Sequence, residues 1–296
     1  MPSLKDLKVR IGSVKSTRKI TSSMKMVAAA KLRRAQEQAE AARPYAERMD
    51  RMVAQLAAAR SGGAGAPPLM VGRGKTDRHL MIVCSADRGL CGSLNAGVAR
   101  ESRRRAVETI AAGHRPKFIF VGKKARGLLR RDYDADTVGV HEDVAKPKLQ
   151  FSTAEAVAEE TLKLWDEDAF DVCTIIYNRF QSAISQEVTA QQLIPLVRGD
   201  EGAGEATASV GGAIYEYEPD EDEILRQLLP RNLAVQIFRA LLESNASEHG
   251  ARMTAMDNAT RNAGDMIDRL TMTYNRSRQA AITKELIEII SGAEAL

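Results

Sequence analysis

The chain has 296 residues, a formal net charge of +4 and an aromatic content of 4%. It holds no run of about 18 apolar residues, which excludes a membrane-spanning helix, and its cysteines lack the spacing of a zinc site. We therefore expect one or two domains with narrow helix–helix seams, and reduced thiols of a cytosolic protein at Cys84, Cys91 and Cys173.

The charge is unevenly distributed along the chain. Residues 1–34 hold ten Lys or Arg against one acid, whereas residues 216–223 hold six acids. A basic helix favours an acidic partner, which can be nucleic acid, anionic lipid or acidic protein. A solvated helix face is the equal alternative for the basic segment.

The first predicted element is a long helix from residue 3 to about residue 60. Pro44 should kink or end it. A segment rich in Gly, Ala and Pro follows at 61–68 and is typical of a linker. Apolar or small side chains recur along the helix at short, regular steps, at Leu4, Leu7, Ile11, Val14, Thr21, Met24, Ala28 and Leu32.

Strand and helix patterns alternate in the middle of the chain. The alternation predicts a Rossmann-like α/β domain with a largely parallel sheet. A helix is expected to start at Ser152, because Glu155 three residues later completes a capping box. Strands are expected at 79–85, 117–121, 136–140, 172–177 and 187–197, helices at 94–112 and 125–131, a loop at 199–212 and an edge strand at 212–218.

The last predicted element is a helix that begins near Asp220, with a first break at Pro230. A repeat of 3.5 residues held this long is typical of a coiled-coil seam, and residues 231–291 would span roughly 90 Å. The repeat consists of Ala246, His249, Met253, Met256, Thr260, Ala263, Ile267, Leu270, Tyr274, Ser277 and Ala281.

Helices of this kind at both ends predict one long antiparallel coiled coil of the N- and C-terminal helices, with the α/β domain between them. The expected divisions are a coiled-coil helix at 1–60, a linker at 61–75, the α/β domain at 76–212 and a C-terminal region at 213–296 that is mostly coiled-coil helix.

The sequence shows no catalytic constellation. Residues 85–92 lie where a phosphate-binding loop would lie, but they lack both glycine fingerprints, so a tight turn is favoured over an anion site. The four histidines, at 79, 114, 141 and 249, are scattered and form no metal-binding pattern. His249 falls on the seam as a packed residue. We expect no enzyme activity and no cofactor.

Residues 274–285 interleave polar and small side chains, which indicates either a solvated helix face or a helix surrounded by other protein. Three segments then resemble the gamma subunit of F-type ATP synthase. Residues 18–32 (RKITSSMKMVAAAKL) resemble its N-terminal signature, residues 87–92 (DRGLCG) its central motif, and residues 247–286 its C-terminal signature. The resemblance covers essentially the whole chain. The absence of a transit peptide and of the chloroplast cysteine insertion favours a bacterial member.

The resemblance implies a central-stalk rotor that transmits torque from a proton-driven c-ring to the catalytic beta subunits. The terminal helices would form a shaft inside an alpha3beta3 hexamer. The epsilon subunit would lie beside the α/β domain, and the c-ring of Fo would lie beneath that domain. An inhibitory subunit remains open. The protein would lie peripherally at the cytoplasmic face of the bacterial plasma membrane, without inserting into it or binding nucleic acid.

The resemblance also assigns contacts to particular residues. By similarity, Met24 and Lys25 lie near an acidic loop of beta. The other rotor–stator contacts would be Arg278, Gln279, Thr283 and Glu285. At the foot of the rotor, the end that faces the c-ring, the contacts with the c-ring would be Tyr215, Tyr217 and Glu218. Ser23 stands where many relatives have alanine.

Two rival functions are less well supported by the sequence. A coiled-coil nucleic-acid-binding protein would need a DNA-reading module or stacking aromatics, and a nucleotide-dependent enzyme would need a phosphate fingerprint.

Overall fold

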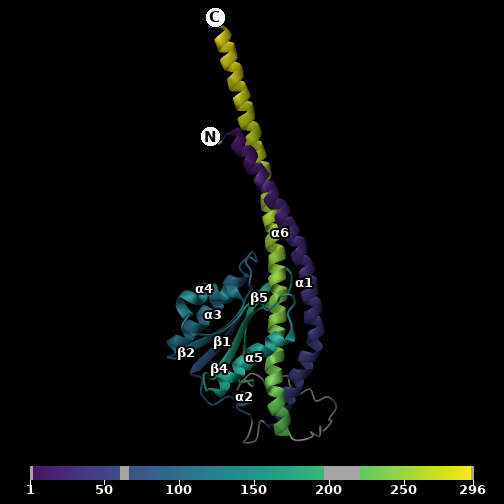
Figure 1. Cartoon of the computed structure of the whole chain (residues 1–296), viewed down its shortest axis with the longest axis vertical. Helices are drawn as coiled ribbons and strands as arrows, with labels where there is room; N and C mark the ends of the chain where they lie inside the picture. The colour runs from purple at the N-terminus through teal and green to yellow at the C-terminus, as the bar shows by residue number, and fades with distance from the viewer. Residues whose placement is uncertain (1–2, 61–66, 197–220, 295–296) are drawn as a thin grey trace. The chain divides into compact units, whose positions relative to one another are not determined.

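The computed structural model describes residues 3–60, 67–196 and 221–294 (Figure 1). The chain divides into two compact units, one formed by Met1–Ala30 with Arg252–Leu296 and the other by Lys31–Ala251. Helices α1 (Leu4–Arg60) and α6 (Glu221–Glu294) contribute residues to both units. The expected loop at 199–212, the edge strand at 212–218 and most of the expected loop at 61–68 lie outside the described residues.

The larger unit contains a five-stranded sheet with the order β3-β2-β1-β4-β5. Strands β1 to β4 are parallel and β5 is antiparallel to β4, so the predicted Rossmann-like, largely parallel sheet is confirmed. The strands are β1 (Arg78–Cys84), β2 (Arg115–Val121), β3 (Thr137–His141), β4 (Val172–Phe180) and β5 (Gln186–Ile194). The helices of this unit, besides α1 and α6, are α2 (Pro68–Val71), α3 (Leu94–Ala111), α4 (Lys123–Tyr133) and α5 (Phe151–Asp166).

Both faces of the sheet are buried. Successive side chains of a strand point to opposite sides, so each strand contributes residues to both faces. On one face Ile82 and Cys173 pack in a cluster with residues of α5 and α6. On the other face Met81 and Phe118 pack with residues of α3 and α4. The three cysteines are buried free thiols, as expected, and burial raises the pKa of Cys84 to about 12.

An ionic cluster holds the start of β1. The buried carboxylate of Asp171 accepts hydrogen bonds from the backbone N–H of Arg78 (3.0 Å) and from its guanidinium Nε (3.1 Å) and Nη2 (2.7 Å). Arg78 also contacts Asp168, which pairs with Arg73, and the Arg73 guanidinium lies 4.0 Å from the ring centroid of Trp165. The Arg78 guanidinium holds the pKa of the Asp171 carboxyl below its ordinary value.

One expected helix boundary is wrong, because helix α6 continues through Pro230, where a break was expected. Helix α1 continues through Pro44, which excludes an end there but not the kink that was the other expectation. A proline inside a helix costs about 3 kcal/mol, and the buried side chains of Leu225, Leu229 and Leu233 around Pro230 offset that cost. Helix α5 starts at Phe151 with no side-chain cap, so the capping box expected at Ser152 does not form.

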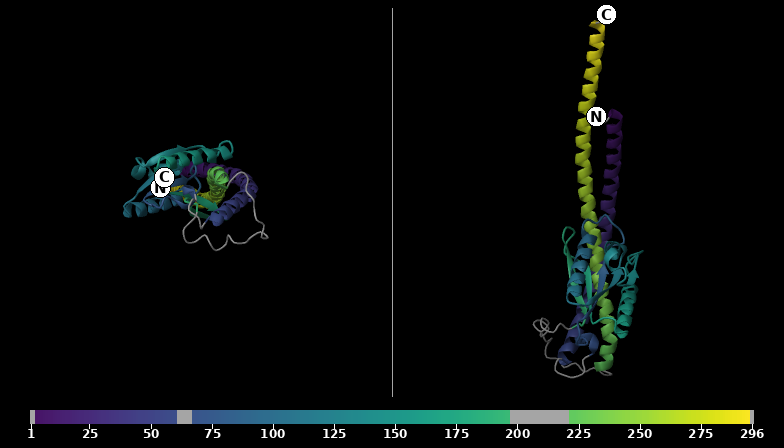
Figure 2. Two further views of the ribbon diagram at one scale, coloured as in Figure 1. Left: turned by 90° about the horizontal axis from the view of Figure 1, so that it is seen from below. Right: turned by 90° about the vertical axis from the view of Figure 1, so that its left-hand side faces the viewer.

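The smaller unit is a pair of antiparallel helices. Two perpendicular views show the beginning of α1 beside α6, and the C-terminal end of α6 extends past the first turn of α1 (Figures 1 and 2). The predicted seam is confirmed, since Leu7 and Ala28 of α1 and Met256, Ala263 and Ile267 of α6 are buried. The remaining predicted seam positions in this unit are buried or half-buried.

Candidate functional site

A polar cluster joins the two helices of the smaller unit. The ammonium group of Lys25 lies 2.6 Å from Oδ1 of Asp257, and the Arg261 guanidinium lies 3.0 Å from Oδ2 of the same carboxylate. About one turn away, the hydroxyl of Thr260 donates a hydrogen bond to the hydroxyl of Thr21 (2.8 Å). Lys25 lowers the pKa of the Asp257 carboxyl, and Arg261 adds to the effect.

The resemblance assigned Met24 and Lys25 of α1 to contacts with a partner subunit and did not predict that Lys25 pairs with Asp257 of α6. Met24 and Lys25 are both half-buried, and Lys25 is paired within the chain itself. The side chain of Lys25 is still 45% exposed, so it can also meet an outside partner. A signal was present in the sequence, because Lys25 and Asp257 each follow a seam methionine, Met24 and Met256. The periodicity alone does not say which residues on the two helices face each other.

Residues 282–291, near the end of α6, are all exposed. The side chains of Arg278, Gln279, Thr283 and Glu285 are exposed, and the Thr283 hydroxyl donates a hydrogen bond to the backbone carbonyl of Gln279 (2.9 Å). Large apolar side chains are exposed beside them, with fractions of 49% for Ile282, 53% for Leu286, 58% for Ile287, 69% for Ile289 and 56% for Ile290. Neighbouring exposed apolar side chains of this size mark a surface that another molecule covers.

The third group of assigned residues, Tyr215, Tyr217 and Glu218, lies outside the described residues.

The loop at 85–92, in the larger unit, is a helix cap. Oδ1 of Asp87 accepts a hydrogen bond from the backbone N–H of Lys123 (3.2 Å), and the Ser85 hydroxyl accepts one from that of Ala125 (3.0 Å). Both donors belong to the first turn of α4, where an anion would otherwise bind. Gly122 has φ +95°, and a Cβ there would lie 2.0 Å from the Ser85 carbonyl oxygen. The chain thus supplies its own carboxylate at the N-terminus of α4. The anion site considered from the sequence belongs to the next helix along the chain, α3, whose N-cap residue Ser93 makes no side-chain cap hydrogen bond.

The same loop is closed from within and covered by α6. The amide oxygen of Asn95 accepts a hydrogen bond from the backbone N–H of Ala86 (2.9 Å), and its nitrogen lies 3.1 Å from Sγ of Cys91. Ala251 of α6 packs in one apolar cluster with Ala86, Cys91 and Leu94. The carboxyl ends of parallel strands are the usual ligand-binding edge of such folds, and here α6 packs against the loop that follows β1.

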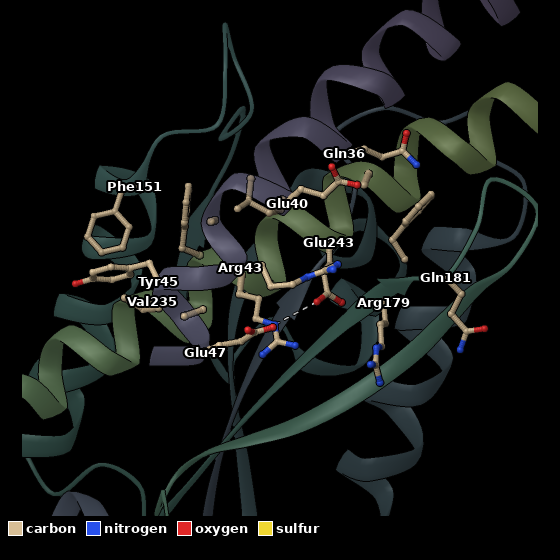
Figure 3. Close-up of a pocket in the computed structure, with 18 of the residues that line it drawn as sticks. Gln36, Glu40, Arg43, Tyr45, Glu47, Phe151, Arg179, Gln181, Val235 and Glu243 are labelled. Carbon is tan, nitrogen blue, oxygen red and sulfur yellow. Dashed lines mark hydrogen bonds and ion pairs between the residues drawn. The ribbon is translucent and has the colours of Figure 1, made fainter. Parts of the chain in front are cut away.

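A cavity of about 910 Å³ in the larger unit was not foreseen from the sequence (Figure 3). It arises where α1 presents small side chains, such as Ala42 and Ala46, toward Phe238 and Leu242 of α6. Its charged groups partly neutralise one another. Arg239 lies 3.3 Å from Glu243, and Arg231 lies 3.4 Å from Glu155 and over the ring of Phe151. The charged side chains that line the cavity are four arginines and three glutamates, so neither sign dominates strongly.

No group of three or more His, Cys, Asp or Glu side chains that could hold a metal occurs in the described part of the chain. None of the helices within those residues is both long enough and apolar enough to cross a bilayer.

Comparisons with known proteins agree on one family. The family model described as ATP synthase matches residues 3–296. The chain is 60% identical to the ATP synthase gamma chain of Chelativorans sp. and 57% identical to that of Paramagnetospirillum magneticum, each over 296 residues and 100% of both chains. Among solved structures, the central stalk and c-ring of the Tetrahymena thermophila mitochondrial ATP synthase match at 27% identity and a TM-score of 0.59, covering 81% of this chain and 99% of that chain.

Proposed function

This chain belongs to the ATP synthase gamma-chain family, and we propose that it is the rotor of the central stalk, carrying torque from the proton-driven c-ring to the catalytic beta subunits. It is the non-catalytic subunit, and the chemistry of ATP belongs to beta. Its partners are the alpha3beta3 hexamer, the epsilon subunit and the c-ring. It lies peripherally on the membrane-bound complex, at the cytoplasmic face of the bacterial inner membrane.

One observation supports this proposal most directly: residues 282–291 of α6 are all exposed and carry apolar and hydrogen-bonding side chains together. Exposed apolar side chains such as Leu286 and Ile290, close together on one helix, indicate a surface that a partner covers. A sleeve formed by a ring of subunits covers a helix from every side, and a single docking groove does not. Apolar contacts without fixed direction also let the helix turn inside the sleeve.

The directed contacts then set the resting angles. In this proposal Met24, Lys25, Arg278, Gln279, Thr283 and Glu285 meet loops of the hexamer, and Tyr215, Tyr217 and Glu218 meet the c-ring. A charge-assisted hydrogen bond contributes about 1.5–3 kcal/mol, which is small enough to break at each step. The chain would be divided into a coiled-coil helix at 1–60, a linker at 61–75, an α/β domain at 76–212 and a C-terminal region at 213–296.

The proposal is tested on the complex purified from membranes. The wild-type chain should copurify with the ring-forming subunits. Arg278→Ala and Gln279→Ala should assemble in near-normal amounts but change ATP hydrolysis and synthesis by roughly tenfold, since about 1.4 kcal/mol is a factor of ten. Leu286→Glu should weaken assembly, because it places a charge in the apolar sleeve.

Lys284→Ala is the matched control, because Lys284 is exposed and lies 3.6 Å from Glu288 within the same helix. It should leave assembly and turnover unchanged. Salt-sensitive DNA binding without copurification would overturn the rotor in favour of the nucleic-acid alternative. If both Arg278→Ala and Gln279→Ala hydrolyse and synthesise ATP at wild-type rates, these polar residues do not take part in torque transmission.

A further inference from the structure

The seam of the smaller unit does little by itself to select one alignment of its helices. Around the middle of the pair the buried residues are Thr21, Ala28, Met256 and Ala263. Alanine is small and methionine is adaptable, so sliding one helix by a turn, about 5.4 Å, would still bury similar side chains. Specific alignment in coiled coils usually comes from a polar pair at the seam.

The polar cluster supplies such a pair at two neighbouring levels. From Thr21 to Lys25 the chain advances one turn along α1, and their partners, Thr260 and Asp257, lie one turn apart in the opposite direction along α6. A slip by one turn would break both contacts at once. Asp257 is fully engaged, because Lys25 binds one carboxylate oxygen and Arg261 the other.

We propose that Asp257 is a positioning residue of the rotor, which holds the Lys25 ammonium and thereby fixes the alignment of α1 against α6. This inference rests on the proposed rotor function. Two paired helices transmit torque as a single rigid unit only if they do not slide past each other. Lys25 has three N–H donors, of which Asp257 takes one, so the pair favours one orientation of the lysine and leaves two donors for a stator carboxylate.

The contribution is one of specificity rather than stability. The side chains of Lys25 and Asp257 are 45% and 33% exposed, so solvent screens their attraction. Such pairs change an equilibrium by at most about fivefold. The aligned state would therefore be favoured over slipped states by a modest factor. Losing the pair should impair coupling in the working complex before it lowers the free energy of unfolding.

The test uses the assembled complex and measures protons pumped per ATP hydrolysed. Asp257→Asn and Lys25→Met should each lower this ratio by up to about fivefold, with normal complex yield. The conservative variant Asp257→Glu keeps a carboxylate for both Lys25 and Arg261 and should restore the ratio to within about twofold. Spin labels at the exposed positions Ser23 and Asn258 should show a broader distance distribution in Asp257→Asn and Lys25→Met than in the wild type and Asp257→Glu. Asp268→Asn, an exposed acid on the same helix, is the control and should change neither measurement.

The outcomes separate the two proposals. If Lys25→Met is impaired while Asp257→Asn behaves as wild type, Lys25 acts only on the stator and the positioning role is overturned. If every variant assembles and couples normally, the positioning role is also overturned, but the rotor function stands. If the wild-type chain does not assemble with a ring at all, the proposed function itself fails.

Discussion

At the scale of single residues, Asp171 makes the stability of the larger unit depend on pH. Its side chain is buried and accepts three hydrogen bonds from Arg78, which hold its pKa below the ordinary value. A carboxylate whose pKa is lowered by folding stabilises the protein above the unfolded pKa, about 3.9. That stabilisation disappears as the pH falls through the lower pKa of the folded state.

We expect Asp171→Asn to lower the free energy of unfolding by about 2 kcal/mol at pH 7, because hydrogen bonds to a charged group are lost. The difference from wild type should shrink below about pH 4, as the wild-type carboxylate becomes protonated. Urea unfolding of both proteins at pH 7 and at successively lower pH measures it, with Asp268→Asn as an exposed control. A difference that stays constant down to acid pH would contradict the ion-pair account.

Residue roles were the hardest feature to predict. Resemblance directed Lys25 toward a partner subunit, whereas the structure pairs it with Asp257, distant in sequence. Periodicity identifies seam positions but not the relative alignment of two helices, which depends on contacts between side chains far apart in the chain. The cap formed by Ser85 and Asp87 was missed for the same reason, since its donors belong to α4.

At the scale of elements, the seam itself followed from the sequence, because a repeat of 3.5 residues leaves few alternatives to helix pairing. Strands β1, β2 and β4 were predicted from their apolar runs. The helix ends were less certain, since local signals compete with packing. Pro230 carries a strong local breaking signal, and α6 continues through it because leucines on both sides are buried.

The seam gives a direct prediction about α1. Ala28 is 2% exposed against α6, whereas Ala30, on the same helix, is exposed. Ala28→Glu should lower the free energy of unfolding of the helix pair by about 2–4 kcal/mol, because it buries an unpaired charge. Ala30→Glu should change it by no more than about 0.5 kcal/mol. Urea titration followed by circular dichroism compares the two, and equal effects would show that the helices are not packed at Ala28.

At the scale of the whole molecule, the Rossmann-like sheet has its own side chains at one of the helix N-termini near the carboxyl ends of its parallel strands. The N-terminal turn of α4 is capped by Asp87 and Ser85, and α6 packs against the same loop. A phosphate approaching this turn would meet a carboxylate of like charge.

The purified chain should therefore release no phosphate from ATP, while the assembled complex does so in the same assay. Phosphate release measured with matched protein concentrations is the test. Turnover by the chain alone that is abolished by Asp87→Ala would place a catalytic site on this subunit and contradict the division of labour proposed above.

The exposed apolar end of α6 has a consequence for how the cell makes this protein. A chain that displays Leu286, Ile287, Ile289 and Ile290 to water is prone to self-association until its partners cover them. Copies made in excess of the ring would collect in aggregates or be removed by proteases. The abundance of the chain would then follow the supply of its partners, and its synthesis would have to keep pace with theirs.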